Sequence, residues 1–276
     1  MRIAISNLAW DVTNDKDMAS LFKQYAIDAI DIAPGKYFPH IKSATTSEII
    51  KVKEWWASRG VAITGMQALL FCTTGLNMFG DHEAQTAMLL HLEDICRIGS
   101  VLEATRLVLG SPKNRDRSLL SDEVTQSVAV KFFNSLGNIA ERYGVIICLE
   151  PNPPCYGANF MTNSAETASV VRDVAHSAIR MQLDTGAMTI NGEDSEEMIQ
   201  KYSDLIGHVH ASEPDLVVLG DGNTDHAKVA AALQCFLPDQ IVTIEMLQSK
   251  SEPSSEAIER ALVVAVRHYG RNEVRK

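Results

Sequence analysis

The feature that most constrains the fold is a regular alternation of short apolar runs with longer amphipathic segments along the chain. Apolar strands that alternate with helices form a parallel sheet that helices cover on both faces. Eight such units over 276 residues favour a closed (β/α)8 barrel, the TIM barrel, over an open doubly wound sheet, and they predict one domain over 1–276. The strands are expected at 2–7, 27–33, 61–67, 104–110, 145–150, 179–184, 206–210 and 241–245.

Helical patterns fill the intervals between these strands. Thr45 and Glu48 have the spacing of a capping box, which predicts a helix that begins there and ends at Arg59-Gly60. No GxGxxG follows the first strand and no GxxxxGK[ST] occurs, so the pattern does not favour a nucleotide-binding fold. Further helices are expected at 14–26, 82–101, 122–143, 164–177, 194–203, 225–236 and 254–269.

Composition narrows the classes of partner. A net charge of −10 and a pI near 5.3 argue against nucleic acid, because a phosphate backbone attracts a basic face. No apolar run reaches the roughly 18 residues of a membrane span, and the first residues lack the pattern of a secretory signal. The five cysteines are scattered without a CxxC pair, which is typical of reduced residues in a cytoplasmic protein.

Four strand-like runs in the second half each end on a residue that binds metals well. In a barrel of this kind the active site lies at the carboxyl ends of the strands. Three carboxylates and one imidazole suit a divalent cation such as Mn²⁺, Co²⁺ or Mg²⁺, with Zn²⁺ as a further option. Charged residues also follow strands simply because loops are solvated, but four consecutive units favour a metal site. The four residues are Glu150, Asp184, His210 and Glu245.

A second layer follows from strand geometry. Side chains two residues apart in a strand share a face, so the residues two positions before the ligands should point inward beneath them. They are Cys148, Gln182, His208 and Thr243, where a purely structural barrel has Val, Ile or Leu. Polar groups in this layer can orient the ligands of a metal. His208 is alternatively a ligand itself.

At these residues the chain resembles the sugar isomerases and epimerases of the xylose-isomerase-like barrel superfamily. The resemblance covers nearly the whole chain through short motifs in the family's order, among them AISNLAW, IDAIDIAPGKYF, LEPNP, QLDTGAM, HVHASEPDL, GDGNTDH and IEML. It implies that the four residues above match the metal positions of the ketose 3-epimerases. It also implies that Glu213 matches a carboxylate near the substrate.

The resemblance implies a proton shuttle as the chemistry. A cation polarises the carbonyl of a sugar or sugar phosphate, and Glu150 and Glu245 remove and return a proton on carbon through an enediolate. Two positions depart from the epimerase pattern. Ala187 stands where that group has a histidine, and Leu216 stands where it has an arginine, which places C3-epimerisation of a free ketose in doubt.

Polar residues of the first half are candidates to replace those two side chains. Lys36, Lys113 or Arg115 is hypothesised to bind a phosphate or carboxylate of the substrate, against the alternative that all three are solvated loop cations. Trp10 is either a platform for a sugar or a residue that packs a loop. The candidate substrate contacts are Asn7, Trp10, Lys36, Gln67, Lys113, Arg115, His208 and Glu213.

Other functions remain open at this point. A lyase similar to inosose dehydratase would use the same metal and expel water. A catalytically inactive barrel with a binding role is a further alternative. DNA repair of the endonuclease IV type is disfavoured, because His40 and His82 lie in loops and the chain is acidic. The expected partner is a small carbohydrate, with neither nucleic acid nor membrane, and the resemblance allows a homo-oligomer.

Overall fold

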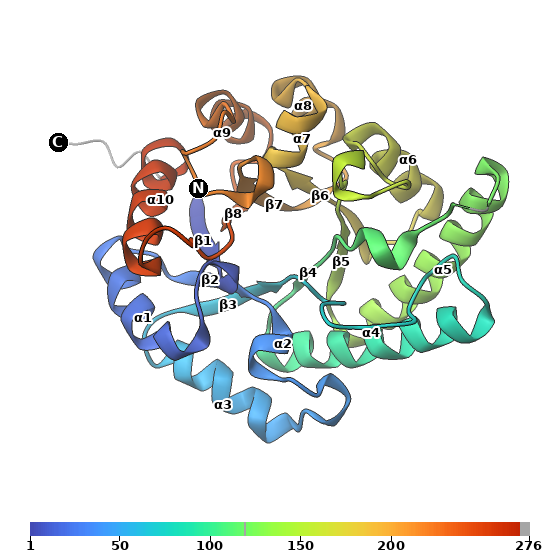
Figure 1. Ribbon diagram of the computed structural model, residues 1–276, viewed down its shortest axis with the longest axis horizontal. Coiled ribbons are helices and arrows are strands. Elements are labelled where there is room, and N and C mark those ends of the chain that lie inside the picture. The colour runs from blue at the N-terminus through green and yellow to red at the C-terminus, as the bar shows by residue number, and fades with distance from the viewer. Residues whose placement is uncertain (119, 271–276) are drawn as a thin grey trace.

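The computed structural model describes residues 1–118 and 120–270, and within them eight parallel strands close into a barrel in sequence order (Figure 1). Strand β1 pairs with both β2 and β8, which closes the ring. The predicted (β/α)8 barrel is confirmed. The strands are β1 Arg2–Ser6, β2 Ala29–Ile32, β3 Ala62–Met66, β4 Arg106–Leu109, β5 Ile146–Leu149, β6 Ile179–Asp184, β7 Ile206–Ser212 and β8 Ile241–Glu245.

Helices surround this ring on its outside (Figure 1). Most of their starts follow local capping rules: α3 begins behind the reciprocal Thr45 and Glu48 capping box that the sequence predicts, and Ser121 caps α5. The helices are α1 Asp15–Gln24, α2 Pro34–Tyr37, α3 Thr46–Ala57, α4 His82–Leu102, α5 Asp122–Tyr143, α6 Ser164–Val174, α7 Thr185–Asn191, α8 Ser195–Tyr202, α9 His226–Phe236 and α10 Ser254–Tyr269.

The hydrophobic core lies mainly between the barrel and its helices, where the apolar faces of the amphipathic helices meet the outward side chains of the strands. Inside the barrel the upper layers are polar instead, with buried Asp31, Gln182, His208 and Thr243. Because the interior of such a barrel is normally filled by branched apolar residues, these polar layers mark a candidate functional region.

Two of the departures from the expected elements lie near the carboxyl ends of the strands, while elsewhere the short helix α2 was not expected and α6 ends earlier than expected. Strand β7 continues past His210 to Ser212, and it is buried along its whole length. Helix α7 follows β6 directly, because the Asp184 side chain accepts a hydrogen bond from Ala187 N and so caps the helix that it precedes. No helix within residues 1–118 and 120–270 is long and apolar enough to cross a membrane.

Candidate metal centre

Four side chains converge at the carboxyl ends of β5 to β8. Glu150 directly follows β5, Asp184 and Glu245 end β6 and β8, and His210 lies near the end of β7. One potential ligand atom from each residue lies within 4.8 Å of the others. His210 Nδ1 is 3.1 Å from Glu245 Oε2 and 3.4 Å from Glu150 Oε1. Consecutive parallel strands bring these residues together, because their carboxyl ends meet at one mouth of the barrel.

The residues present fit a divalent cation. All four are buried. Within the described chain His210 Nε2 makes no hydrogen bond, and His210 Nδ1 and Glu150 Oε1 have only the imidazole–carboxylate contacts given above. A buried polar atom without a hydrogen bond is costly, so Nε2 in particular calls for a ligand. Hard carboxylate oxygens with one imidazole are a donor set that Mn²⁺, Co²⁺, Mg²⁺ and Zn²⁺ accept.

The electrostatics of the cluster agree with this fit. Burial, together with the nearby carboxylates of Glu245 and Glu150, raises the pKa of Asp184 to about 8. Burial also opposes the charge on Glu245, but His210 and the amide of Gln67 outweigh it and lower the pKa of Glu245. Three carboxylates therefore share more negative charge than His210 alone balances, and a divalent cation would relieve it.

A set of hydrogen bonds fixes Asp184. Ser212 Oγ donates to Asp184 Oδ2 at 2.7 Å and accepts from Gly186 N at 2.9 Å, while Ala187 N donates to Asp184 Oδ1 at 2.6 Å. Such contacts orient the ligands of a metal. Sequence reasoning missed Ser212, although the period of two that links His208 to His210 extends to it.

Glu150 and Glu245 are also held from outside the cluster. The Gln67 amide donates to Glu245 Oε1, and Asn152 Nδ2 donates to Glu150 Oε2 at 3.3 Å. A Cβ at Gly110 would meet Glu150 Oε2 at 1.7 Å. Only glycine at position 110 therefore leaves room for this carboxylate in the position that it takes.

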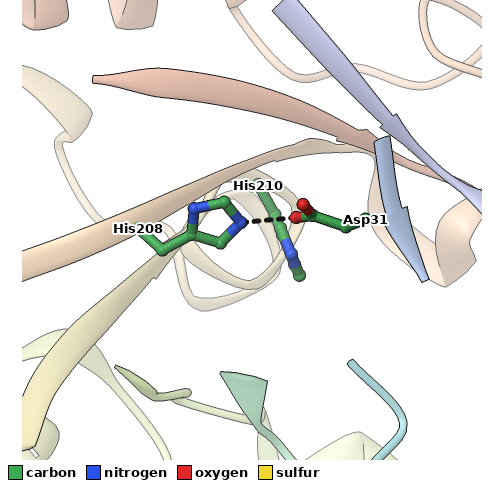
Figure 2. Close-up of side chains that lie close together, drawn as sticks. All are labelled: Asp31, His208 and His210. Atoms are coloured by element: carbon green, nitrogen blue, oxygen red, sulfur yellow. Dashed lines mark hydrogen bonds and ion pairs between the residues drawn. The ribbon is translucent and has the colours of Figure 1, made fainter. Parts of the chain in front are cut away.

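The layer beneath contains a buried ion pair that sequence reasoning missed. His208 Nε2 lies 2.7 Å from Asp31 Oδ2, and Thr243 Oγ1 donates to the same oxygen at 2.9 Å. Figure 2 shows the His208 ring aimed at Asp31, with the His210 ring beside this contact. Burial opposes the charge of Asp31, but His208 outweighs it and lowers the pKa of Asp31.

Asp31 lies on β2, across the barrel from β7, so only closure of the ring brings this pair together. Asp31 Oδ2 occupies His208 Nε2, and His208 is not part of the four-residue cluster, which favours its orienting role over the alternative that it is a ligand there. Of the other two residues expected in this layer, Cys148 and Gln182 are both fully buried.

A cavity of about 280 Å³ opens above the four residues. Of the eight residues that the sequence suggests as substrate contacts, Gln67 and Glu213 line it, whereas the other six do not. Its walls also include both departures from the epimerase pattern, Ala187 and Leu216.

Trp10 and Asn7 lie behind the cavity wall rather than on it. Trp10 is fully buried, donates from Nε1 to Asp15 Oδ1 at 2.7 Å and packs edge-on against Phe22 and Trp56. The hypothesis of a sugar platform gives way to a packing role, because no face of this indole reaches the cavity. Asn7 is equally buried, and its Oδ1 accepts from Ala33 N at 2.7 Å, which joins the ends of β1 and β2.

The three cations expected to bind an anion lie elsewhere. Lys36 Nζ donates to the carbonyl oxygens of Asn7 and Trp10 at 2.5 and 2.7 Å, and Lys113 is exposed outside the cavity. Arg115 is buried and donates to Glu150 O at 2.8 Å and to Asn152 Oδ1 at 2.5 Å. Arg115 therefore supports the backbone of Glu150 instead of facing a phosphate.

Glu213 lines the cavity, but its carboxylate accepts its hydrogen bonds from the segment that follows β7. It accepts from Gly220 N at 2.9 Å, from Thr224 N at 3.0 Å and from His226 Nε2 at 3.0 Å. Burial opposes the charge, yet these donors outweigh it and lower the pKa of Glu213 to about 2. In this structure Glu213 fixes the loop rather than presenting a free carboxylate to a substrate.

Known proteins that are similar to this chain include D-psicose 3-epimerases. The chain is 29% identical over 107 residues to a D-psicose 3-epimerase of Enterocloster bolteae, a stretch that is 38% of this chain and spans only 35% of that relative. A D-psicose 3-epimerase of Clostridium cellulolyticum H10, solved with D-tagatose, superposes with a TM-score of 0.81 at 16% identity and covers 98% of this chain and 99% of that one.

A further solved structure, the IOLI protein with a bound zinc atom, superposes with a TM-score of 0.76 at 18% identity and covers 98% of both chains. At these identities the two superpositions show a shared fold. The model of the xylose isomerase-like TIM barrel family matches residues 20–264, which is most of the chain. The chain therefore belongs to the xylose isomerase-like TIM barrel family.

Proposed function

We propose that the protein is a divalent-metal-dependent epimerase or isomerase of a sugar or a related hydroxyketone, with Glu150 and Glu245 as its acid and base. The observation that carries the proposal is the convergence of Glu150, Asp184, His210 and Glu245 beneath a cavity of about 280 Å³. The volume is close to the lower end of about 300–1,000 Å³ for small-molecule sites, which suits a ligand as small as a monosaccharide. The D-psicose 3-epimerase named above supports a ketose as substrate.

In this proposal the four residues hold one cation, Mn²⁺, Co²⁺, Mg²⁺ or Zn²⁺. When bound, it would polarise the carbonyl of the substrate and stabilise the negative charge that develops as the neighbouring carbon loses a proton. Glu150 and Glu245 come from the outer two of four consecutive strands and approach His210 Nδ1 separately. One carboxylate removes the proton from carbon and the other returns a proton.

The surrounding hydrogen bonds serve this exchange. Gln67 donates to Glu245, and Asn152 and Arg115 hold the side chain and backbone of Glu150, so neither carboxylate needs to search for its position. Catalytic groups held in place before the reaction lower the cost of reaching the reactive geometry. Epimerisation would follow if the proton returns to the opposite face of the same carbon, and isomerisation if it returns to the neighbouring carbon.

The test uses chelator-treated protein, reloaded with each of the four cations and incubated with ketohexoses and ketopentoses in D₂O. Deuterium at a carbon next to the carbonyl, together with a new epimer or an aldose, supports the proposal. Loss of water from the product would point to a lyase instead. A loaded protein that exchanges no carbon-bound proton in any of these sugars would contradict the proposed reaction and favour a binding role.

Two variants test whether Glu150 and Glu245 are the groups that transfer the proton. Glu150→Gln and Glu245→Gln keep the size of each side chain and one ligand oxygen, and each should lower turnover by about 10²–10⁴-fold. Metal content is measured in parallel, so that loss of the cation is not mistaken for loss of proton transfer. Glu54→Gln, an exposed change on α3, is the matched control and should leave turnover unchanged.

We further propose a cytoplasmic setting. All five cysteines are free, as expected where thiols stay reduced. The net charge of −10 supports a small carbohydrate rather than nucleic acid as the ligand. Association into a homo-oligomer is part of the same proposal, and light scattering of the purified protein tests it.

A further inference from the structure

The walls of the cavity above the candidate metal centre are built from apolar side chains, although its floor is charged. Two groups form them. Leu69, Leu70 and Phe71 lie in the segment after β3, and Ala187 and Leu216 lie on the side of β6 and β7. Phe71 is 77% exposed at the rim, so the apolar wall reaches the surface of the molecule. An exposed apolar surface that continues into a cavity is typical of a binding site.

Both walls stand on strained backbone. Asp215 and Leu216 have φ of +58° and +52°, and Ala68 and Cys72, which bracket the other wall, have φ of +53° and +61°. Residues with a side chain seldom adopt this region of φ, and a bulky side chain such as that of leucine is disfavoured there. Strain of this kind persists only where surrounding contacts impose it, and it is concentrated at functional sites.

Surrounding contacts do impose this conformation at Leu216. Leu216 N donates to Glu213 O at 3.0 Å, Leu247 N donates to Leu216 O at 2.9 Å, and Asp215 N donates to the hydroxyl of Tyr156 at 2.7 Å. Tyr156 itself lines the cavity. One contact within the loop and two from separate segments, those of Tyr156 and Leu247, thus hold the main chain in the conformation that carries Leu216 on the cavity wall.

The described lining of the cavity also offers no positively charged side chain to an anion. Among the described residues, no Lys, Arg or His lines it, whereas four carboxylates do: Glu150, Asp184, Glu213 and Glu245. A divalent cation would not fully balance the three carboxylates that could hold it. A phosphate entering this site would therefore be both repelled and stripped of water without a partner.

We infer that the substrate is an uncharged hydroxyketone with an apolar group, such as a methyl group in place of a terminal hydroxymethyl group or phosphate, and that Leu216 selects it. The inference rests on the proposed function, because it assumes that the polar floor holds the hydroxyketone. An apolar group on such walls loses water from both surfaces, whereas a hydroxyl placed there would lose its hydrogen bonds. The strained position of Leu216 is then part of specificity.

The test measures binding and turnover for four probes: D-fructose, 1-deoxy-D-fructose, 6-deoxy-D-fructose and D-fructose 6-phosphate. Calorimetry with Mn²⁺-loaded protein gives the affinities without requiring a reaction. At least one deoxy sugar should bind ten-fold or more tightly than D-fructose, since an apolar pocket discriminates against an added hydroxyl by up to about 10²-fold. The phosphate should bind most weakly of the four.

A pair of neighbouring variants separates selection from stability. Leu216→Asn introduces a residue that tolerates positive φ, so the backbone can stay as it is while the apolar surface is lost. The preference for the deoxy sugar should then fall by ten-fold or more. Val217→Asn, at the adjacent residue, which is 41% exposed and outside the cavity, should leave the preference unchanged. A preference that survives in Leu216→Asn would overturn the role of Leu216.

The other outcomes are equally decisive. Equal or tighter binding of D-fructose or its phosphate would overturn the inference and leave the proposed reaction intact. A deoxy preference in binding without proton exchange in any probe would support the inference and contradict the reaction. Failure of all four probes to bind would overturn the inference, because the cavity would then not accept hydroxyketones.

Discussion

Ser212 links the candidate metal centre to the backbone around it. Its hydroxyl lies between Asp184 Oδ2 and Gly186 N, so one small side chain orients a ligand and the start of α7 together. A group of this kind contacts neither cation nor substrate, yet its loss frees the carboxylate to rotate.

We expect Ser212→Ala to lower Mn²⁺ affinity by about 10–100-fold, the usual cost of removing a contact that orients a metal ligand. Titration calorimetry on chelator-treated protein measures the effect. Ser20→Ala, on the exposed side of α1, is the control and should bind Mn²⁺ as the wild type does. An unchanged affinity in Ser212→Ala would show that Asp184 needs no such support.

Asp31 permits a second comparison at the scale of single residues. Asp31 pairs with His208 with both side chains buried, whereas Asp28 pairs with Arg2 with a side chain that is 59% exposed. Breaking a buried ion pair by removing one partner costs about 3–5 kcal/mol, and breaking an exposed one costs about 0–1 kcal/mol. Urea unfolding should therefore show a large loss of stability for Asp31→Ala and a small one for Asp28→Ala. Similar losses would mean that burial does not strengthen the dependence on the Asp31–His208 pair.

At the scale of elements, the loop between β7 and α9 depends on one carboxylate. Glu213 accepts hydrogen bonds from Gly220, Thr224 and His226, and the His226 ring in turn contacts the Tyr269 hydroxyl at 2.6 Å. These contacts join the end of β7 to α9 and α10. The wall that contains Leu216 begins at the same residue, so fixing this loop also fixes one side of the cavity.

This loop should respond to acid in a defined direction. The pKa of Glu213 is about 2 in the folded protein against an ordinary 4.5, so its charge stabilises the fold above pH 4.5 and the contribution disappears as the pH falls towards 2. The shift corresponds to roughly 3 kcal/mol as an upper bound. In urea unfolding, the stability difference between wild type and Glu213→Gln should be largest near neutral pH and should shrink as the solution is acidified. Glu54→Gln should show no such trend.

The elements themselves were largely predictable. The expected helix at 122–143 coincides with α5, since a serine cap, an amphipathic pattern and a terminal glycine mark both ends locally. Helix α7 was missed because Asp184 is at once the end of a strand and the cap of a helix, and the short segment after it has no clear periodicity. The sequence predicts a strand that ends at His210, because Ala211 and Ser212 have the small side chains of loop residues. Their burial shows that β7 continues to Ser212.

At the scale of the whole molecule, a cation held by residues from four strands should stabilise the entire fold. Binding to the folded state alone adds RT ln(1 + [L]/Kd), about 2.7 kcal/mol when the free cation is at 100 times its Kd. The midpoint temperature of thermal unfolding should therefore rise with Mn²⁺ concentration, and it should return to its starting value when a chelator is added. Asp184→Ala should remove most of this dependence, and a wild-type transition that ignores Mn²⁺ would contradict the site.

The candidate site was predictable in one respect and hidden in another. Glu150, Asp184, His210 and Glu245 stand at the ends of successive strands, so chain order alone suggests that they meet. Lys36, Trp10 and Arg115 could not be placed in this way, because tertiary contacts decide whether a loop side chain faces the cavity or turns behind it. The contact of Asp31 with His208 could not be predicted for the same reason, because the two residues are 177 positions apart in the chain.

The Asp31–His208 contact also bears on how the chain can be divided. Strand β2 forms early in synthesis, but the imidazole that balances its carboxylate arrives only with β7, and the hydroxyl of Thr243 only with β8. A fragment made of the first four units would lack both of these partners, so the Asp31 carboxylate would lose the contacts that satisfy it in the closed ring. Half-barrels cut from this protein should therefore be poor modules for recombination, and the ring gains a reason to close as a single unit.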